Sequence, residues 1–428
     1  MKSALINALS WILKKIAQLT ILKYRPGVIG VTGSVGKTST KLAIAAVLGN
    51  ERHVRFSPES HNTEIGFPLA IISEWSLREL ELVSKTAPPG VRRPEKTLFW
   101  LKVICFGLWQ LIVRKKDYPE MLILEYGADR PGDLKKLIMI ARPNLGVITA
   151  IGDIPVHVEF YSGPDEVARE KSRLVENLSS ASFAILNHDD ESVMNIKDRT
   201  RAHLITFGFT KGSDVRIVNF ENRAEANGQP RGVAFKLEYG GSSVPVRLDG
   251  VFGRAQAYAA AAAAAVGAAF GVNLIKIAEA LKNYKPAQGR MDLVAGIKST
   301  WIIDDSYNAS PLSMHVALDT LRSLPAKRKI AVLGDMLEIG QYAMQAHETI
   351  GNFLAPFVDL LVTVGPRAKF IAEGARANGF NRKKILSFDE AEDAEGKLEQ
   401  ILKPGDLVLF KASRAMHLEK LVEEVRVI

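Results

Sequence analysis

The chain has 428 residues, too many for one ordinary domain, and this length predicts two or three domains that each bury a core. Apolar residues make up 47% and charged residues 24%, which excludes a disordered chain and a membrane protein with many spans. The single cysteine excludes an intramolecular disulfide and fits a reducing cytoplasm. The net charge of +9 favours anionic partners such as nucleotides, phosphorylated sugars, nucleic acid or an acidic membrane surface, without choosing among them.

The first predicted element is an amphipathic helix over residues 1–24, where apolar residues recur near helical spacing with lysines between them. A second apolar segment, residues 98–113, is interrupted by Lys102 and is shorter than the roughly 20 residues that span a bilayer. We expect both helices to pack against the protein. Peripheral attachment to the inner face of the membrane is the alternative, and no transmembrane helix is predicted.

From residue 27 onward, short apolar strands alternate with helix-like stretches, which predicts a mostly parallel sheet with helices on both faces. Residues 214–248 alternate apolar and polar side chains around Asn227-Gly228 and Gly240-Gly241, which predicts an antiparallel patch on that sheet. The alanine-rich run 255–269 predicts a helix. The predicted strands are 28–32, 121–124, 145–149 and 183–186.

Pro286 and Gly289 interrupt helix-like sequence and predict a domain boundary, after which strands and helices alternate again. The predicted strands beyond it are 300–303, 330–333, 360–364 and 407–410. The predicted α/β organisation is an N-terminal helix over 1–26, a central P-loop-type domain over 27–285 with an apolar basic insertion at 76–118, and a Rossmann-like domain over 286–428.

The sharpest motif, Gly30 to Ser39, lies where a predicted strand ends and a helix begins. Glycines let the backbone curl so that N–H groups point at phosphate oxygens, and the helix N-terminus adds its positive dipole. Lys37 would then reach the β- and γ-phosphates, and the Thr38 hydroxyl would bind Mg²⁺. The strict P-loop glycine is Val31 here, so the motif is the variant Gly-x-x-Gly-Lys-Thr-Ser.

This variant resembles the phosphate loop of the Mur ligase family, whereas the related folylpolyglutamate synthetases usually have Gly-Lys-Gly-Ser at this point. From residue 27 to the C-terminus, further segments follow in the order of the family branch that adds D-alanyl-D-alanine. These segments are His61–Leu69, Leu124–Gly132, Gly289–Asp292, Asp304–Pro311, Leu333–Gly340 and Lys411–Met416.

The resemblance implies an ATP-dependent, ADP-forming ligase that joins a carboxylate to an amine through an acyl phosphate in peptidoglycan synthesis. It implies ATP and Mg²⁺ as cofactors, and a muramoyl-peptide and D-alanyl-D-alanine as substrates. We expect a cytoplasmic monomer without a nucleic-acid partner, because no basic patch is interleaved with aromatic residues.

The residues themselves place Glu125 at the end of a predicted strand, where its carboxylate would face the phosphate loop as a metal ligand; a helix cap or a surface carboxylate is the alternative. The resemblance adds a second metal site from His157 and Lys171, with the lysine carbamylated so that it becomes a carboxylate-like ligand. The predicted metal ligands are thus Thr38, Glu125, His157 and Lys171, and the predicted catalytic residues are Lys37, Asn62, Glu125, His157 and Lys171.

The remaining predicted site residues bind ATP or the incoming amine. Lys411, Ser413 and Arg414 would bring polar donors from the C-terminal domain to the amino substrate; an exposed basic loop is the alternative. Gln256 stands where the family has an asparagine near the adenine. The predicted ATP-binding residues are Gly33, Ser34, Val35, Gly36, Lys37, Thr38, Ser39, Gln256, Arg290, Asp305 and Asn308.

The chain departs from the family pattern at its start, where only residues 1–26 precede the phosphate loop and a domain that grips a UDP-sugar is expected. One hypothesis is that the substrate is lipid-linked or is held by membrane-facing helices. The alternatives are a ligase of the same superfamily that acts on a lipid-linked muropeptide, a folate or another peptide, and, from a different class, a nucleotide-switch protein that hydrolyses ATP or GTP.

Overall fold

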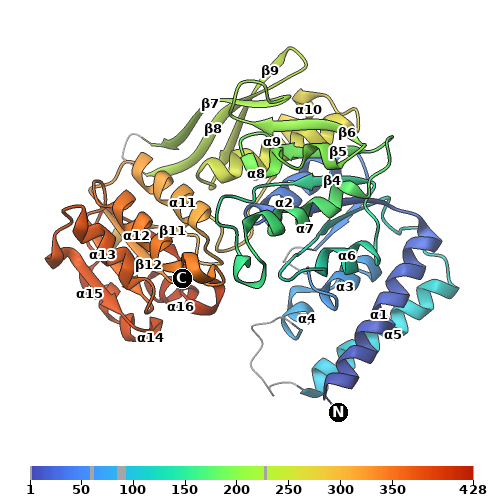
Figure 1. Cartoon of the computed structure of the whole chain (residues 1–428), viewed down its shortest axis with the longest axis horizontal. Helices are drawn as coiled ribbons and strands as arrows, with labels where there is room; N and C mark the ends of the chain where they lie inside the picture. The colour runs from blue at the N-terminus through green and yellow to red at the C-terminus, as the bar shows by residue number, and fades with distance from the viewer. Residues whose placement is uncertain (1, 58–61, 84–92, 226–228, 428) are drawn as a thin grey trace.

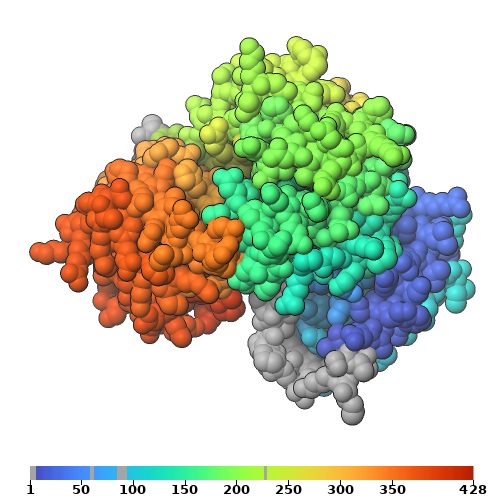
Figure 2. All heavy atoms as spheres, in the orientation of Figure 1, coloured from blue at the N-terminus to red at the C-terminus, as the bar shows by residue number. Residues whose placement is uncertain are grey.

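The computed structural model describes residues 2–57, 62–83, 93–225 and 229–427, with the backbone alone at residues 2–5 and 93. His61, the Asn227-Gly228 turn and residues 84–92 of the predicted insertion lie outside these ranges. Three parts follow one another across the molecule (Figure 1). A helical pair at the N-terminus flanks a central sheet domain, and the C-terminal domain lies on the other side of that sheet domain (Figure 2).

Within the described ranges the central domain holds a nine-stranded sheet in the order β2-β3-β1-β4-β5-β6-β7-β8-β9. The pairs from β2 to β7 are parallel, and β7, β8 and β9 are antiparallel, which confirms both the parallel sheet and its antiparallel patch. Two strands, β2 and β6, were not predicted. The strands are β1 (Gly27–Thr32), β2 (Val54–Phe56), β3 (Met121–Glu125), β4 (Leu145–Ile148), β5 (Phe183–Asn187), β6 (His203–Gly208), β7 (Val215–Ala224), β8 (Pro230–Tyr239) and β9 (Ser242–Asp249).

Helices cover both faces of this sheet, as predicted. On one face α2 packs against the alanine-rich α9, where a Cβ added to Gly267 would lie 3.0 Å from Val47 Cγ1, so small side chains allow a close approach. On the other face α3, α6 and α7 cover a separate apolar core. The helices of this domain are α2 (Lys37–Gly49), α3 (Gly66–Ile72), α4 (Leu77–Glu81), α6 (Asp133–Ile138), α7 (Pro164–Glu176), α8 (Glu191–Met194), α9 (Arg254–Ala269) and α10 (Leu274–Leu281).

The C-terminal domain holds, among the described residues, a six-stranded sheet in the order β10-β11-β15-β12-β13-β14. Only the β10–β11 pair is antiparallel, so the predicted doubly wound pattern is confirmed, with β10 and β14 as strands not predicted. The strands are β10 (Asp292–Gly296), β11 (Thr300–Asp304), β12 (Arg328–Gly334), β13 (Leu360–Val364), β14 (Ile385–Phe388) and β15 (Asp406–Lys411). The helices are α11 (Pro311–Ser323), α12 (Ala343–Leu354), α13 (Lys369–Ala377), α14 (Ala391–Ala394), α15 (Lys397–Ile401) and α16 (Glu419–Val425).

The N-terminal helix α1 (Lys2–Tyr24) packs against α3 and against α5 (Arg93–Ile112). Leu13, Ile16 and Val103 are buried where these helices meet, and a Cβ added to Gly107 would lie 2.6 Å from Ile16 Cγ2. The prediction that both helices pack against the protein is therefore confirmed. Among the described residues, no helix combines the length and the apolar character needed to cross a bilayer.

Candidate active site

The phosphate loop connects β1 to α2, as its sequence predicted. Gly33 has φ +146° and Gly36 has φ +87°, both in the region that favours glycine. A Cβ on Gly33 would lie 2.0 Å from Thr149 Oγ1, so only glycine fits beside the end of β4. The backbone N–H groups of Ser34 and Val35 donate to the carbonyl of Ala150 at 2.6 and 3.1 Å, which fixes the loop to the neighbouring strand.

Lys37 begins α2 and folds back over its own loop. Its ammonium donates to the carbonyl oxygens of Gly33 at 2.8 Å and Ser34 at 3.4 Å. Burial lowers the pKa of Lys37, while the nearby carboxylate of Glu125 opposes that shift. The Lys37 ammonium is therefore held against the backbone of the glycine turn.

Glu125, the last residue of β3, faces the same helix. Its Oε2 accepts a hydrogen bond from Thr38 Oγ1 at 2.9 Å and lies 3.4 Å from Lys41 Nζ, with the side chains of Glu125 and Lys41 almost fully buried. Burial would raise the pKa of Glu125, but the cations of Lys41, Lys37 and Arg290 outweigh it, so the pKa is lowered. The carboxylate is thus ionised at the phosphate loop, as required of a metal ligand.

Lys41 was not among the predicted site residues. It lies four residues after Lys37 and directly before the apolar run Leu42–Leu48, so the two lysines share one helix face. A lysine one helical turn after Lys37, on the same helix face, was the signal for a charged partner, because an unpaired buried ammonium is costly.

Asn62 lies against the chain that leaves β3. A Cβ added to Gly127 would lie 2.9 Å from the Asn62 side-chain amide, so the two residues are in close contact two positions beyond Glu125. The structure therefore brings Asn62 to the same edge of the sheet as Glu125. Glycine at position 127 is needed for this approach.

His157 lies between the central and C-terminal domains, with φ +71°. Its Nε2 lies 3.3 Å from Asp129 Oδ1 of the central domain, and its Nδ1 lies 2.7 Å from Glu338 Oε2 of the C-terminal domain. The contacts of Asp129 and Glu338 with His157 were not predicted, although both residues lie within segments that the sequence analysis had selected.

Lys171 is buried inside α7, where burial lowers its pKa to about 7, helped by Lys37 and opposed by Asp129 and Glu170. Asp129 is therefore a common neighbour of Lys171, Lys37 and His157. Among the described residues, no group of three or more His, Cys, Asp or Glu side chains is arranged to hold a metal. A metal here would need hydroxyl, carbamate or phosphate oxygens as well.

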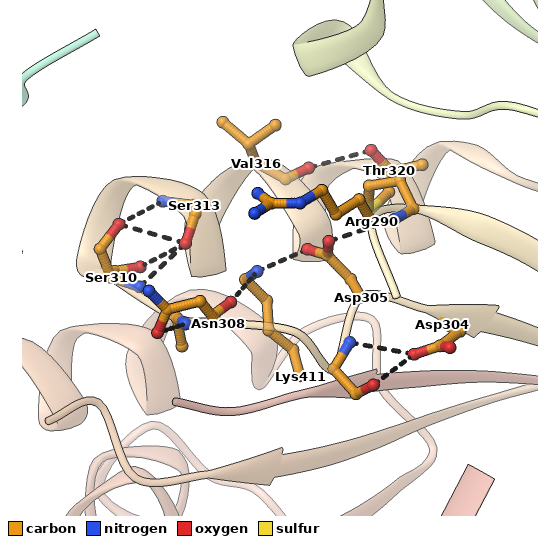
Figure 3. Close-up of polar contacts among 12 residues, drawn as sticks. Arg290, Asp304, Asp305, Asn308, Ser310, Ser313, Val316, Thr320 and Lys411 are labelled. Carbon is orange, nitrogen blue, oxygen red and sulfur yellow. Dashed lines mark hydrogen bonds and ion pairs between the residues drawn. The ribbon is translucent and has the colours of Figure 1, made fainter. Parts of the chain in front are cut away.

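Figure 3 shows the C-terminal side of the site, which contains Arg290, Asp305 and Asn308. The Asp305 carboxylate accepts a hydrogen bond from Met291 N at 3.1 Å and from Lys411 Nζ at 2.5 Å, and Lys411 also donates to the Asn308 carbonyl at 2.9 Å. Lys411 thus ties the end of β15 to the segment after β11. Its ammonium is buried in these contacts rather than exposed in a basic loop.

Arg290 and Arg414 both lie beside Tyr307, with guanidinium carbons 4.1 and 5.0 Å from its ring centroid. The Nε of Arg290 is buried without a hydrogen-bond partner among the described residues. Arg290 also lies near enough to Glu125 and Lys37 to shift their pKa values, so it connects the two halves of the site.

Two predicted residues have their polar atoms engaged within the protein. The Gln256 amide is buried, donates to the Arg290 carbonyl at 3.1 Å and accepts from the Tyr284 hydroxyl at 2.5 Å. The Ser413 hydroxyl accepts from Leu337 N at 2.8 Å. That Gln256 contacts adenine and that Ser413 contacts the amino substrate remain predictions.

Comparison with known proteins agrees with this geometry. Two family models match the chain, the Mur ligase middle domain over residues 106–267 and the Mur ligase, glutamate ligase domain over residues 289–414. The UDP-N-acetylmuramoyl-tripeptide–D-alanyl-D-alanine ligase of Mycobacterium leprae is 30% identical over 423 residues, covering 92% of this chain and 72% of that protein. This chain belongs to the Mur ligase family.

Other members align over a similar share of this Mur ligase. The Bacillus subtilis enzyme of the same name is 28% identical over 415 residues, covering 96% of this chain and 79% of that protein. The structure of MurF ligase from Thermotoga maritima in complex with ADP has a TM-score of 0.75 at 26% identity, covering 97% of this chain and 83% of that one. The alignment therefore includes both sheet domains.

The environments of two buried lysines predict opposite effects of their removal. The pKa of Lys171 is about 7 in the folded chain against 10.5 for an ordinary lysine, so between these pH values the unfolded chain binds more protons and stability rises with pH. Lys171→Met removes the free-energy cost of burying a charged ammonium at this position. We expect it to raise the midpoint of thermal unfolding at pH 7 in carbonate-free buffer, by an amount that shrinks as the pH rises toward 10.

Lys41→Met is the matched comparison, because it leaves the Glu125 carboxylate buried without its lysine partner. We expect it to lower the same midpoint, since breaking a buried pair costs about 3–5 kcal/mol. If Lys171→Met lowered the midpoint of thermal unfolding at pH 7 as much as Lys41→Met does, the expectation of opposite effects would be wrong.

Proposed function

We propose that this Mur ligase uses ATP to join a muramoyl-tripeptide carboxylate to the amine of D-alanyl-D-alanine, forming an amide bond of a peptidoglycan precursor. The observation that carries the proposal is the Lys37–Thr38–Glu125 arrangement at the glycine turn, with Arg290 beside it from the C-terminal domain. The relatives named for this reaction and the ADP-bound MurF structure support the same assignment.

The reaction needs ATP because a carboxylate and an amine do not condense in water. Attack of the carboxylate on the γ-phosphoryl group of ATP gives an acyl phosphate and ADP, and attack of the amine then expels phosphate. Phosphoryl transfer depends on positioned cations that balance the charge developing on the phosphate oxygens. Lys37 supplies one such cation from the central domain, and Arg290 supplies another from the domain boundary.

Mg²⁺ fits the pair of oxygen donors at the loop, since Thr38 Oγ1 and Glu125 Oε2 lie 2.9 Å apart and Glu125 is ionised. When bound, Mg²⁺ would neutralise charge on the β- and γ-phosphates. His157 and a carbamylated Lys171 would hold a second ion. The low pKa of Lys171 supports carbamylation, because only the neutral amine combines with carbon dioxide.

Substrate positioning falls to groups on both domains. Asn62 lies beside Gly127 at the edge of the sheet that carries Glu125, where it would face the acyl group. Arg414 is partly exposed beside Tyr307 and would contact the incoming dipeptide, while Lys411 would act indirectly by holding Asp305. Because these groups come from two domains, closure would assemble the site and exclude water from the acyl phosphate.

The proposal places the enzyme in the cytoplasm as a monomer, with residues 1–24 and 98–113 in contact with the inner face of the membrane. Both segments leave large apolar side chains exposed after packing on each other. A lipid-linked muropeptide is the second candidate substrate, favoured by this same surface.

The test of turnover is ADP release with UDP-muramoyl-tripeptide and D-alanyl-D-alanine together. We expect release to depend on both substrates, and Lys37→Ala to lower kcat by roughly 10²- to 10³-fold, as loss of one transition-state contact does. Lys282→Ala removes an exposed lysine of the same domain and should change nothing. ADP release that is independent of D-alanyl-D-alanine would instead favour a nucleotide switch.

Carbamylation of Lys171 is tested by carbon-13 NMR of the protein in labelled bicarbonate. We expect a carbamate signal that grows as the pH rises through about 7, because the fraction of neutral Lys171 amine grows in that range. The signal should be absent from Lys171→Arg and retained in Lys282→Ala. A spectrum in which Lys171→Arg keeps the signal would assign the carbamate elsewhere.

A further inference from the structure

Helices α1 and α5 each expose an apolar stripe after they have packed together. On α1 the stripe includes Trp11, Leu19 and Leu22, with exposed fractions of 61%, 49% and 67%. On α5 the stripe includes Leu101, Leu108 and Ile112, with exposed fractions of 54%, 50% and 84%. Spacings of three, four and seven or eight residues place each set on one helix face, opposite the buried one.

The two helices run side by side in the same direction and end together (Figure 1). Gln110 Nε2 donates to Thr20 Oγ1 at 3.3 Å, and Lys23 Nζ donates to the carbonyls of Gln110 and Leu111 at 2.9 Å. The rings of Tyr24 and Tyr118 stack with centroids 4.1 Å apart. Both C-terminal ends are therefore fixed at one place.

A pocket of about 500 Å³ opens at this place, lined by Tyr24, Arg25, Arg114, Lys115, Lys116 and Tyr118 among others. Glu120 also lines it, but its carboxylate lies 3.8 Å from Arg52. Among the described residues, no carboxylate pairs with Arg25, Arg114 or Lys116. Four basic residues thus line a space wide enough for a phosphate group, and the ammonium of one of them, Lys115, lies 4.9 Å from the Phe106 ring centroid.

Stabilisation of the helix ends does not account for these cations. Lys23 already donates to the last carbonyls of α5, which is the contact that a helix C-terminus favours. Arg25 follows α1 with φ +50°, a conformation that normally selects glycine or asparagine. The chain has an arginine there, and it lines the pocket.

We propose that the α1–α5 face docks on a bilayer containing anionic phospholipid, with the apolar stripes in the interface and a lipid phosphate in the pocket beyond Tyr24. This inference extends the membrane contact proposed above and does not depend on ligase activity. Trp11 and Trp109 belong to the exposed face, and tryptophan is enriched at the level of lipid headgroups.

Charge favours an anionic bilayer over a second copy of the chain. Residues 2–26 contain five Lys or Arg and no Asp or Glu, and residues 94–118 contain five Lys or Arg and two acidic residues. Two copies of this face would bring like charges together, whereas anionic lipids attract juxtaposed basic residues. An anionic bilayer can bury the apolar stripes and pair with the basic residues at the same time.

The exposed Cys105 on α5 provides a probe, because it is the only cysteine of the chain and follows Leu101 by one helical turn. We expect an environment-sensitive fluorophore on Cys105 of the full chain to shift to shorter wavelength with vesicles of phosphatidylcholine and phosphatidylglycerol. Vesicles of phosphatidylcholine alone should give a weak shift, and salt should weaken the effect with anionic vesicles.

Flotation with the same vesicles tests the two parts of the face. Arg114→Gln with Lys116→Gln should reduce binding roughly tenfold or more, since each basic residue near an anionic surface contributes a factor of about five. Leu101→Gln with Ile112→Gln should also reduce it. The matched controls are Arg382→Gln with Lys383→Gln, and Ile275→Gln with Met344→Gln, which change exposed residues outside α1 and α5.

Several outcomes would overturn the proposal. The first is a Cys105 probe whose emission does not shift, together with no flotation. The second is flotation that the pocket and stripe variants leave unchanged. The third is a dimer in solution that the Leu101→Gln, Ile112→Gln variant loses, while no vesicle binds. ADP release with soluble substrates should be the same in the control, pocket and stripe variants. Loss of vesicle binding is thereby separated from failure of the ligase assignment.

Discussion

The structure depends on one backbone constraint, the turn between β1 and α2. Gly33 lies beside Thr149 with no room for a Cβ, and the amides of Ser34 and Val35 are held by the Ala150 carbonyl. The turn is therefore fixed by the segment that follows β4 and by the Lys37 ammonium, which donates to the carbonyls of Gly33 and Ser34. Lys37 and Thr38 lie at the start of α2, directly after this turn, and a helix N-terminus beside a glycine turn is suited to a triphosphate.

The rest of the site is arranged around that turn by the order of the strands. Because β3 and β4 both neighbour β1, Glu125 at the carboxyl end of β3 and Thr149 directly after β4 reach the loop from its two sides. The C-terminal domain adds Arg290 and a segment held by Lys411 and Asp305. The N-terminal helices lie away from this edge, so a membrane-facing role for them leaves the chemistry undisturbed.

Much of the fold follows from local sequence, since buried parallel strands such as β1 and β12 are continuous apolar runs. The strands that were missed have weaker signals: β2 has three residues, and β6 includes exposed positions such as Leu204. The motifs predicted that Lys37, Thr38 and Glu125 lie close together, and the structure places them at one end of the sheet. Partners such as Lys41 for Glu125, or Tyr284 for Gln256, could not be assigned, because they depend on which side chains meet across elements distant in the chain.

Binding of the ATP phosphates by the glycine turn can be measured by calorimetric titration of the chain with magnesium and a non-hydrolysable ATP analogue. Gly33→Ala forces a Cβ against Thr149, whereas a Cβ on Gly163 meets nothing within 4 Å. We expect Gly33→Ala to weaken binding at least about tenfold, a loss of roughly 1.4 kcal/mol, and Gly163→Ala to bind as the unmutated chain does. Equal affinity of the folded Gly33→Ala and Gly163→Ala variants would contradict this expectation.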